Sequence, residues 1–139
     1  MDKGLTLIAC VDDRMGMLFN RRRQSKDRVM RERLLARLGG KRLCLSPYSA
    51  RLFGDVPSLF VSDDPFFDAS FADAVFWEDT RATLDGVETV ILYRWGESYP
   101  RDVLFPYDLV GEGCVHAESE EFEGSSHDKI TEDIYRRKG

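Results

Sequence analysis

The chain has 139 residues, of which 42% are hydrophobic and 32% charged, and a formal net charge of −5. This composition fits one globular domain over residues 1–139 and excludes a disordered chain, because so much apolar sequence can bury a core. No run approaches the roughly 20 apolar residues of a membrane-spanning helix, and the start is a poor signal peptide, so we expect a soluble cytoplasmic protein with no membrane partner.

The first predicted element is a strand over residues 4–11, which is apolar at nearly every position, as in a sheet covered on both faces. A helix is expected next over residues 26–38, with Ser25 as its N-cap. Its apolar residues recur every three to four positions, and Gly39-Gly40 ends it. The start of the chain therefore predicts a strand followed by a helix.

The remainder is predicted to be rich in strands. We expect strands over residues 43–45, 58–61, 74–77, 88–93 and 107–115, and a brief helix over residues 48–53. Behind Ser126 as a cap, Ile130 and Ile134 lie four residues apart, which favours a short C-terminal helix. The predicted fold class is α/β, with a mixed, mostly parallel central sheet and flanking helices.

Two carboxylates follow the first strand, at the edge where open α/β sheets place their ligands. Asp12 and Asp13 can bind a ligand there or accept the amides of a turn, and both roles stay open. Asp27 lies in the first turn of the predicted helix, where the helix dipole favours a negative charge. Partial burial would raise its pKa into a range that suits proton donation, so Asp27 is the candidate catalytic residue.

Three consecutive arginines precede the predicted helix. Arg21, Arg22 and Arg23 approach its N-terminus, and together they can clamp a phosphate or form a solvated basic loop. Residues 1–53 hold 13 Lys and Arg against 5 Asp and Glu, whereas residues 54–139 hold 7 against 20. Such a division marks a basic face for a phosphorylated or nucleotide-like ligand or a nucleic acid, unless the two halves neutralise each other on folding.

Metal and nucleophilic chemistry find little support in the sequence. The two histidines, His116 and His127, match no metal-ligand spacing, and the three cysteines form no paired motif, so we expect no metal and three buried thiols. No GxSxG motif is present, and Ser126 is the only serine next to a histidine. Nucleophilic catalysis by a serine is therefore not predicted.

Four segments carry a family resemblance. Residues 7–17 are similar to a first strand with a mobile substrate loop, and residues 41–49 to a strand and turn that hold cofactor phosphate with Gly-Arg-x-Thr. Residues 90–99 are similar to a strand and helix start with a Gly-Gly pair and a tyrosine, and residues 123–127 to an acidic-Gly-x-Thr-His segment. In this order they resemble the dihydrofolate reductase-like fold.

The resemblance assigns roles to several residues. Asp27 matches the helix position of the family's catalytic acid if one residue is deleted from the preceding loop, and Tyr99 matches the tyrosine near the nicotinamide site. Ser49 alone keeps a hydroxyl of the phosphate-binding turn, and Trp95 replaces a glycine where the cofactor lies. These departures disfavour NADPH, so we expect no cofactor.

The resemblance also implies a fold shortened at its C-terminus, without the family's final hairpin, and the exposed edge would suit a homodimer. We expect a ligand-binding or assembly protein rather than a working NADPH-dependent folate reductase. Its pocket would lie between Asp12 and Asp13, the loop to Arg23, and the segment holding Trp95 and Tyr99. Two alternatives stay open: an enzyme on a phosphorylated or nucleic-acid substrate, such as an altered reductase, a phosphodiesterase or a ribonuclease, and an RNA-binding protein using the basic N-terminal face.

Overall fold

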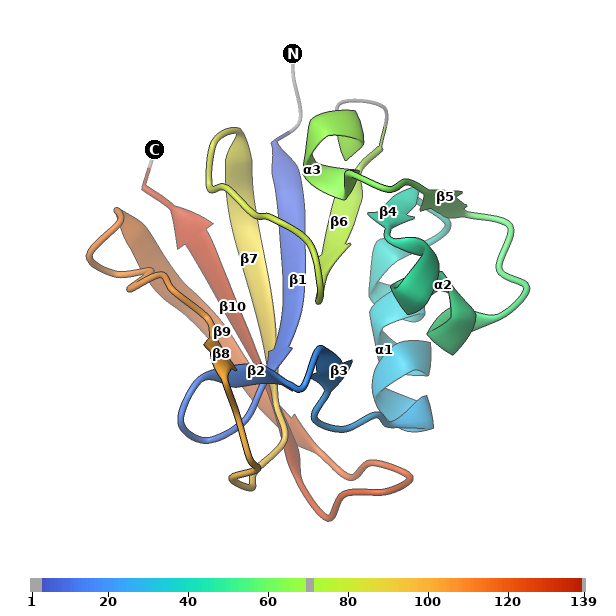
Figure 1. Ribbon diagram of the computed structural model, residues 1–139. Coiled ribbons are helices and arrows are strands. Elements are labelled where there is room, and N and C mark those ends of the chain that lie inside the picture. The colour runs from blue at the N-terminus through green and yellow to red at the C-terminus, as the bar shows by residue number, and fades with distance from the viewer. Residues whose placement is uncertain (1–3, 70–71, 139) are drawn as a thin grey trace.

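The computed structural model describes residues 4–69 and 72–138. Seven strands form the main sheet: β1 (Leu5–Val11), β4 (Leu43–Leu45), β5 (Leu59–Val61), β6 (Ala74–Trp77), β7 (Val87–Arg94), β9 (Cys114–Phe122) and β10 (Ile130–Arg137). A small sheet holds β2 (Gly16–Phe19), β3 (Arg22–Arg23) and β8 (Val103–Leu104), and the helices are α1 (Arg28–Leu38), α2 (Pro47–Phe53) and α3 (Pro65–Asp68). The main sheet has the order β5-β4-β6-β1-β7-β10-β9 (Figure 1).

Strand β1 lies in the middle of the sheet and pairs in parallel with β6 and β7. Its side chains alternate between two apolar layers, Leu7 packing in one and Ile8 in the other. The layer of Ile8 is covered by α1 through Met30 and Leu34, and burial of each such side chain contributes about 1.5–3 kcal/mol. The predicted buried strand and the mixed, mostly parallel sheet are confirmed, since only β9 and β10 run antiparallel to their neighbours.

Helix α1 begins two residues later than predicted. Its N-cap is Asp27, whose side chain accepts the Met30 N–H at 3.1 Å, so the expected cap role of Ser25 is wrong. A carboxylate at the cap position satisfies a backbone donor that the helix leaves free. The helix ends as predicted at Gly39, which adopts the left-handed conformation with φ 59°.

The prediction of a C-terminal helix is wrong, because residues 130–137 form strand β10 between β7 and β9. Ile130 and Ile134 share a face in a strand as well as in a helix, so a spacing of four does not separate the two. Between them, Glu132 is buried against α1, where Arg37 contacts its carboxylate at 2.8 Å and the Tyr93 hydroxyl donates to it at 2.7 Å. The predicted strand over 107–115 is also wrong, since turns occupy most of that segment and β9 starts at Cys114.

The fold is not shortened at its C-terminal end, because β9 and β10 form an antiparallel hairpin that extends the sheet. The edge that was expected to attract a second copy of the chain is therefore covered. The outer strand β9 instead carries Glu118, Glu120 and Glu121, and charged side chains at an edge oppose pairing with another chain. Among the described residues, no helix is long and apolar enough to cross a membrane.

Candidate functional site

Asp12 lies directly after β1 and is fully buried. Its Oδ1 accepts the backbone N–H groups of Arg14 and Gly16 at 2.9 and 2.7 Å. Its Oδ2 accepts the Gln24 side-chain amide at 3.0 Å and the Tyr99 N–H at 3.1 Å. Burial alone would raise the pKa of Asp12, but these hydrogen bonds hold it below its usual value. The carboxylate therefore joins three segments of the site.

Two roles were predicted for Asp12 and Asp13: binding a ligand or accepting the amides of a turn. Asp12 accepts turn amides. Asp13 is exposed, and its own backbone N–H donates to the Glu97 carbonyl at 2.9 Å. The Asp13 side chain thus lies on the surface beside the turn, away from the buried donors that hold Asp12.

Asp27 is also fully buried, and the chain's own groups surround its carboxylate. Oδ1 accepts the N–H groups of Met30 and Ser125 at 3.1 and 3.0 Å, and Oδ2 accepts the Ser126 N–H at 2.8 Å. Nδ1 of His127 lies 2.9 Å from Oδ2. Burial would raise the pKa of Asp27, but the bonds from His127 and the three amides hold it well below the usual range. The expected raised pKa is therefore wrong.

Gly124 lets the C-terminal loop reach Asp27. A Cβ atom at this position would overlap the Asp27 Oδ2 atom and would lie 2.8 Å from Cδ1 of Ile130. The Gly124 N–H also donates to the His127 carbonyl at 2.9 Å, which closes the loop on itself. The glycine of segment 123–127 is thus required by close packing against the buried carboxylate.

His127 connects Asp27 to a serine hydroxyl. Its side chain is 4% exposed and stacks on Trp95, with ring centroids 4.6 Å apart. Nε2 of His127 lies 2.7 Å from Oγ of Ser25. Because an ionised Asp27 can only accept, Nδ1 carries a proton, and in the neutral ring Nε2 is left to accept the Ser25 O–H. The order Ser25, His127, Asp27 is that of a nucleophile, a base and an orienting carboxylate.

The structure does not bring the three arginines together. Arg23 forms two bonds to the Glu78 carboxylate, at 2.8 and 2.9 Å, and its guanidinium lies over the Tyr48 ring. Ser49 is bonded to the same carboxylate, since its hydroxyl donates to Glu78 Oε1 at 2.7 Å. Arg21 is exposed at the turn between β2 and β3, where its φ is 62°, and Arg22 is exposed beside it. Of the three, only Arg22 is both exposed and in the lining of a hollow at this edge of the sheet.

A hollow of about 470 Å³ opens at this edge of the sheet. Its lining residues come from the β2–β3 hairpin and the segment after β7: Phe19, Asn20, Arg22, Arg23, Gln24, Tyr99 and Pro100. The Tyr99 hydroxyl donates to Glu97 at 2.5 Å. Trp95 is buried and stacks on His127. It does not line the hollow, so its contact with the site is through the His127 ring.

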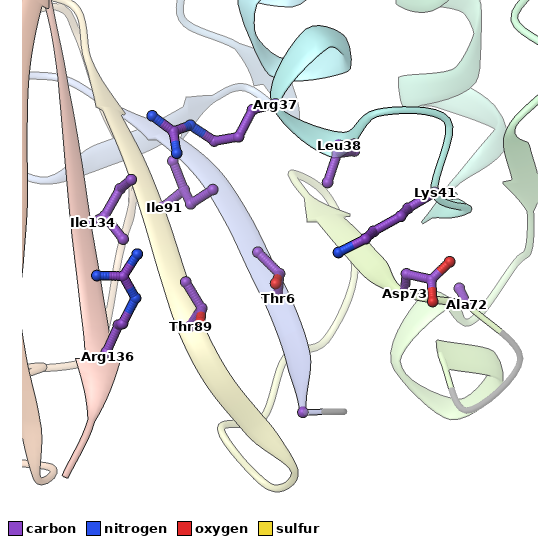
Figure 2. Close-up of a pocket in the computed structure, with 11 residues that line it drawn as sticks. Thr6, Arg37, Leu38, Lys41, Ala72, Asp73, Thr89, Ile91, Ile134 and Arg136 are labelled. Carbon is purple, nitrogen blue, oxygen red and sulfur yellow. The ribbon is translucent and has the colours of Figure 1, made fainter. Parts of the chain in front are cut away.

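A second hollow, of about 270 Å³, lies at the opposite end of the central strands (Figure 2). Arg37 reaches it from the last turn of α1, Lys41 from the loop that follows this helix, and Arg136 from β10. Arg37 is bonded to Glu132 at 2.8 Å, and Arg136 to Glu118 at 2.6 Å. This basic hollow was not predicted, because its members are spread from the first strand to the last.

Metal-binding and thiol groups contribute little to either hollow. In the part of the chain that the structure describes, no group of three or more His, Cys, Asp or Glu side chains is placed to hold a metal ion. Cys10, Cys44 and Cys114 are free thiols. Burial raises the pKa of Cys44 to about 11 and also raises the pKa of Cys10, so neither is poised as a thiolate nucleophile.

Two residues of the site were missed by the sequence reasoning. The sequence pattern indicates a helix cap at Ser25, and it gives His127 no partner outside its own segment. They lie 102 residues apart, and no local motif joins them. The available signal was the similarity of residues 123–127 to a family segment ending in histidine, combined with the family position assigned to Asp27.

No protein-family model matches this sequence, and no curated protein matches it. Among solved structures, the chain is similar to dihydrofolate reductase from Enterococcus faecalis, solved in complex with NADP(H) and RAB-propyl. The TM-score is 0.65 at 11% identity, over 98% of this chain and 97% of that chain. The chain has a dihydrofolate reductase-like fold. The predicted fold is thereby confirmed, and the coverage of the reductase agrees with the presence of the C-terminal hairpin.

Proposed function

We propose that this chain binds a small anionic molecule at the carboxyl end of β1 and does not work as an NADPH-dependent folate reductase. The exclusion of reductase function rests on the Asp27 carboxylate, which is buried and already hydrogen-bonded by this chain. The acid that the resemblance assigns to this position must reach its substrate, whereas four donors of this chain surround the Asp27 carboxylate. With its pKa held low, Asp27 is also a poor proton donor at neutral pH.

The cofactor side supports the same proposal. In the turn that the resemblance assigns to cofactor phosphate, the Ser46 hydroxyl donates to Asp79 at 2.7 Å and the Ser49 hydroxyl donates to Glu78 at 2.7 Å. Both hydroxyls are occupied, and both partners are carboxylates. A dinucleotide phosphate at this turn would lose its donors and meet negative charge, which disfavours its binding.

The hollow beside Tyr99 suits a small ligand that combines one anionic group with an apolar part. Arg22 is exposed there, and no carboxylate of the described residues lies within 4.0 Å of its guanidinium. Phe19, whose side chain is 42% exposed, supplies an apolar wall, and the Gln24 and Tyr99 side chains supply polar groups. A phosphate or carboxylate would bind Arg22 while a ring packs on Phe19.

Thermal unfolding with small probes tests this proposal. We expect phenyl phosphate to raise the melting temperature, because a ligand at ten times its Kd stabilises the native state by about 1.4 kcal/mol. Arg22→Glu should abolish the shift, whereas Arg51→Glu, an exposed charge change on α2, should keep it. NADPH and folate should give no shift. A clear shift with NADPH or folate would overturn the exclusion of reductase function, and no shift with phenyl phosphate would overturn the ligand class.

A further inference from the structure

We propose that Ser25 is a nucleophile for which His127 is the general base and Asp27 the orienting carboxylate, and that this group cleaves esters that carry a second anionic group. The inference rests on the proposed function in one respect, because the substrate enters through the hollow beside Tyr99. The nucleophile–base distance is 2.7 Å and the base–carboxylate distance is 2.9 Å. Both lie within the hydrogen-bonding reach that nucleophilic catalysis requires.

The base is fixed more firmly than a surface histidine would be. Asp27 holds Nδ1, and Trp95 covers one face of the ring, with 20° between the two planes. Asp27 is itself fixed by three backbone N–H groups, from Met30, Ser125 and Ser126. The His127 ring therefore has one tautomer and one orientation, which leaves Nε2 directed at Ser25.

The Ser25 hydroxyl is not needed for the local backbone. Asp27, not Ser25, caps α1, and among the described residues the hydrogen-bond partner of the Ser25 hydroxyl is the His127 ring. The loop of His127 is already anchored by its bonds to Asp27. A hydroxyl that caps no helix but lies within hydrogen-bonding distance of a fixed base is arranged for chemistry.

The reaction proceeds in two steps, acylation of Ser25 and hydrolysis of the acyl-serine. The Ser25 oxygen attacks the ester carbonyl carbon while its proton passes to His127 Nε2. The tetrahedral intermediate then collapses, the bond to the leaving oxygen breaks, and His127 returns the proton to the leaving alcohol. In the second step water, deprotonated by His127, attacks the acyl-serine, and the Ser25 oxygen leaves and regains the proton. Acid and alcohol are the products, and nothing is oxidised or reduced.

Two neighbours define the substrate. Arg22 and Lys26 lie on either side of Ser25 in the chain, and both are exposed. Their charge favours an acyl group that ends in a carboxylate or phosphate over a neutral acyl group.

The test compares hydrolysis of p-nitrophenyl succinate and p-nitrophenyl acetate, together with labelling by a fluorophosphonate followed by peptide mass spectrometry. We expect the wild-type protein to prefer the succinate and to carry the label on Ser25. Ser25→Ala should lose the label and reduce hydrolysis about 100-fold or more. The matched control is Ser98→Ala, an exposed serine next to Tyr99, which should keep both.

Each outcome bears on one proposal. Failure of the wild-type protein to hydrolyse faster than Ser25→Ala, or labelling that persists in Ser25→Ala, overturns the nucleophile. If phenyl phosphate still stabilises the wild-type protein in that case, the proposed function stands while this inference fails. His127→Gln, which keeps a polar side chain at the base position, should remove hydrolysis while the phenyl phosphate shift remains. Hydrolysis retained by His127→Gln would overturn the role of the base.

Discussion

The two ends of the central strands use charge in different ways. At the carboxyl end, Asp12, Asp27 and Glu78 are buried, and each accepts several hydrogen bonds from its own chain. At the amino end, Lys41 and Arg136 are exposed around an open hollow (Figure 2). Buried charges that are fully paired fix one arrangement of the backbone, whereas exposed charges add little stability and remain available to solvent. The buried carboxylates at the carboxyl end thus hold the local backbone, whereas the exposed Lys41 and Arg136 at the amino end add little stability.

The largest expected effect is at Asp27. Asp27→Ala leaves His127 and three backbone N–H groups without an acceptor, so we expect a loss of about 3–5 kcal/mol in the free energy of unfolding. Urea denaturation measures this loss. Asp13→Ala, which removes an exposed carboxylate nearby, should change stability by less than about 0.5 kcal/mol. Equal losses for the two variants would contradict the difference between buried and exposed carboxylates.

Acid should destabilise the protein through Asp27. The folded-state pKa of Asp27 lies below the unfolded value, so its stabilisation is complete above about pH 4 and is lost as the pH falls toward the folded pKa. The pKa of Asp12 is also lowered in the folded state, so its protonation in acid likewise reduces the free energy of unfolding. The melting temperature of the wild-type protein should therefore fall steeply below pH 4. In Asp27→Asn, which lacks the titrating group, the fall should be shallower, and identical profiles would contradict this role of Asp27.

A smaller effect is expected at Arg23, whose partner Glu78 is buried while Arg23 itself is partly exposed. Arg23→Ala leaves the Glu78 carboxylate with fewer donors, and we expect a loss of about 1–3 kcal/mol. The control is Arg28→Ala, because Arg28 pairs with Glu32 on the exposed face of α1, where a pair contributes about 0.3–0.5 kcal/mol. Chemical denaturation of both variants gives the comparison, and a loss at Arg28 as large as at Arg23 would argue against it.

The smallest effect belongs to the amino end. Lys41→Ala should change the free energy of unfolding by less than about 0.5 kcal/mol, because its side chain is exposed and forms no ion pair within the described residues. Arg136→Ala should behave alike, since its pair with Glu118 is half-exposed. A double variant that loses more than about 2 kcal/mol would show that this end also has a structural role, contrary to the comparison.

The predictable parts of the fold are those with a local signal. The apolar runs of β1, β4, β6 and β7 locate the central sheet, and Gly39 locates the end of α1. The strand β10 was missed because Glu132 reads as a solvent-facing residue until Arg33 and Arg37, more than 90 residues away, are placed over it. Burial of a charge depends on partners that only the folded chain brings together.

The candidate site shows the same limit. The positions of Asp12 and Asp27 were predicted, but the low pKa of Asp27 was not, because its donors come from residues 125–127 at the other end of the chain. Arg23 and Ser49 were predicted to bind phosphate, and the Glu78 carboxylate that binds both lies directly after β6. The expected homodimer, the cytoplasmic location and the binding of RNA stay predictions.

The contact between Asp27 and the loop of His127 joins residues 100 positions apart. During synthesis the first helix and strand emerge long before the segment that completes the site. Contacts of such long sequence separation form late and slow the folding of a domain. We expect assembly of Ser25, His127 and Asp27 to be among the last folding events, and any activity of the site to report on a fully folded chain.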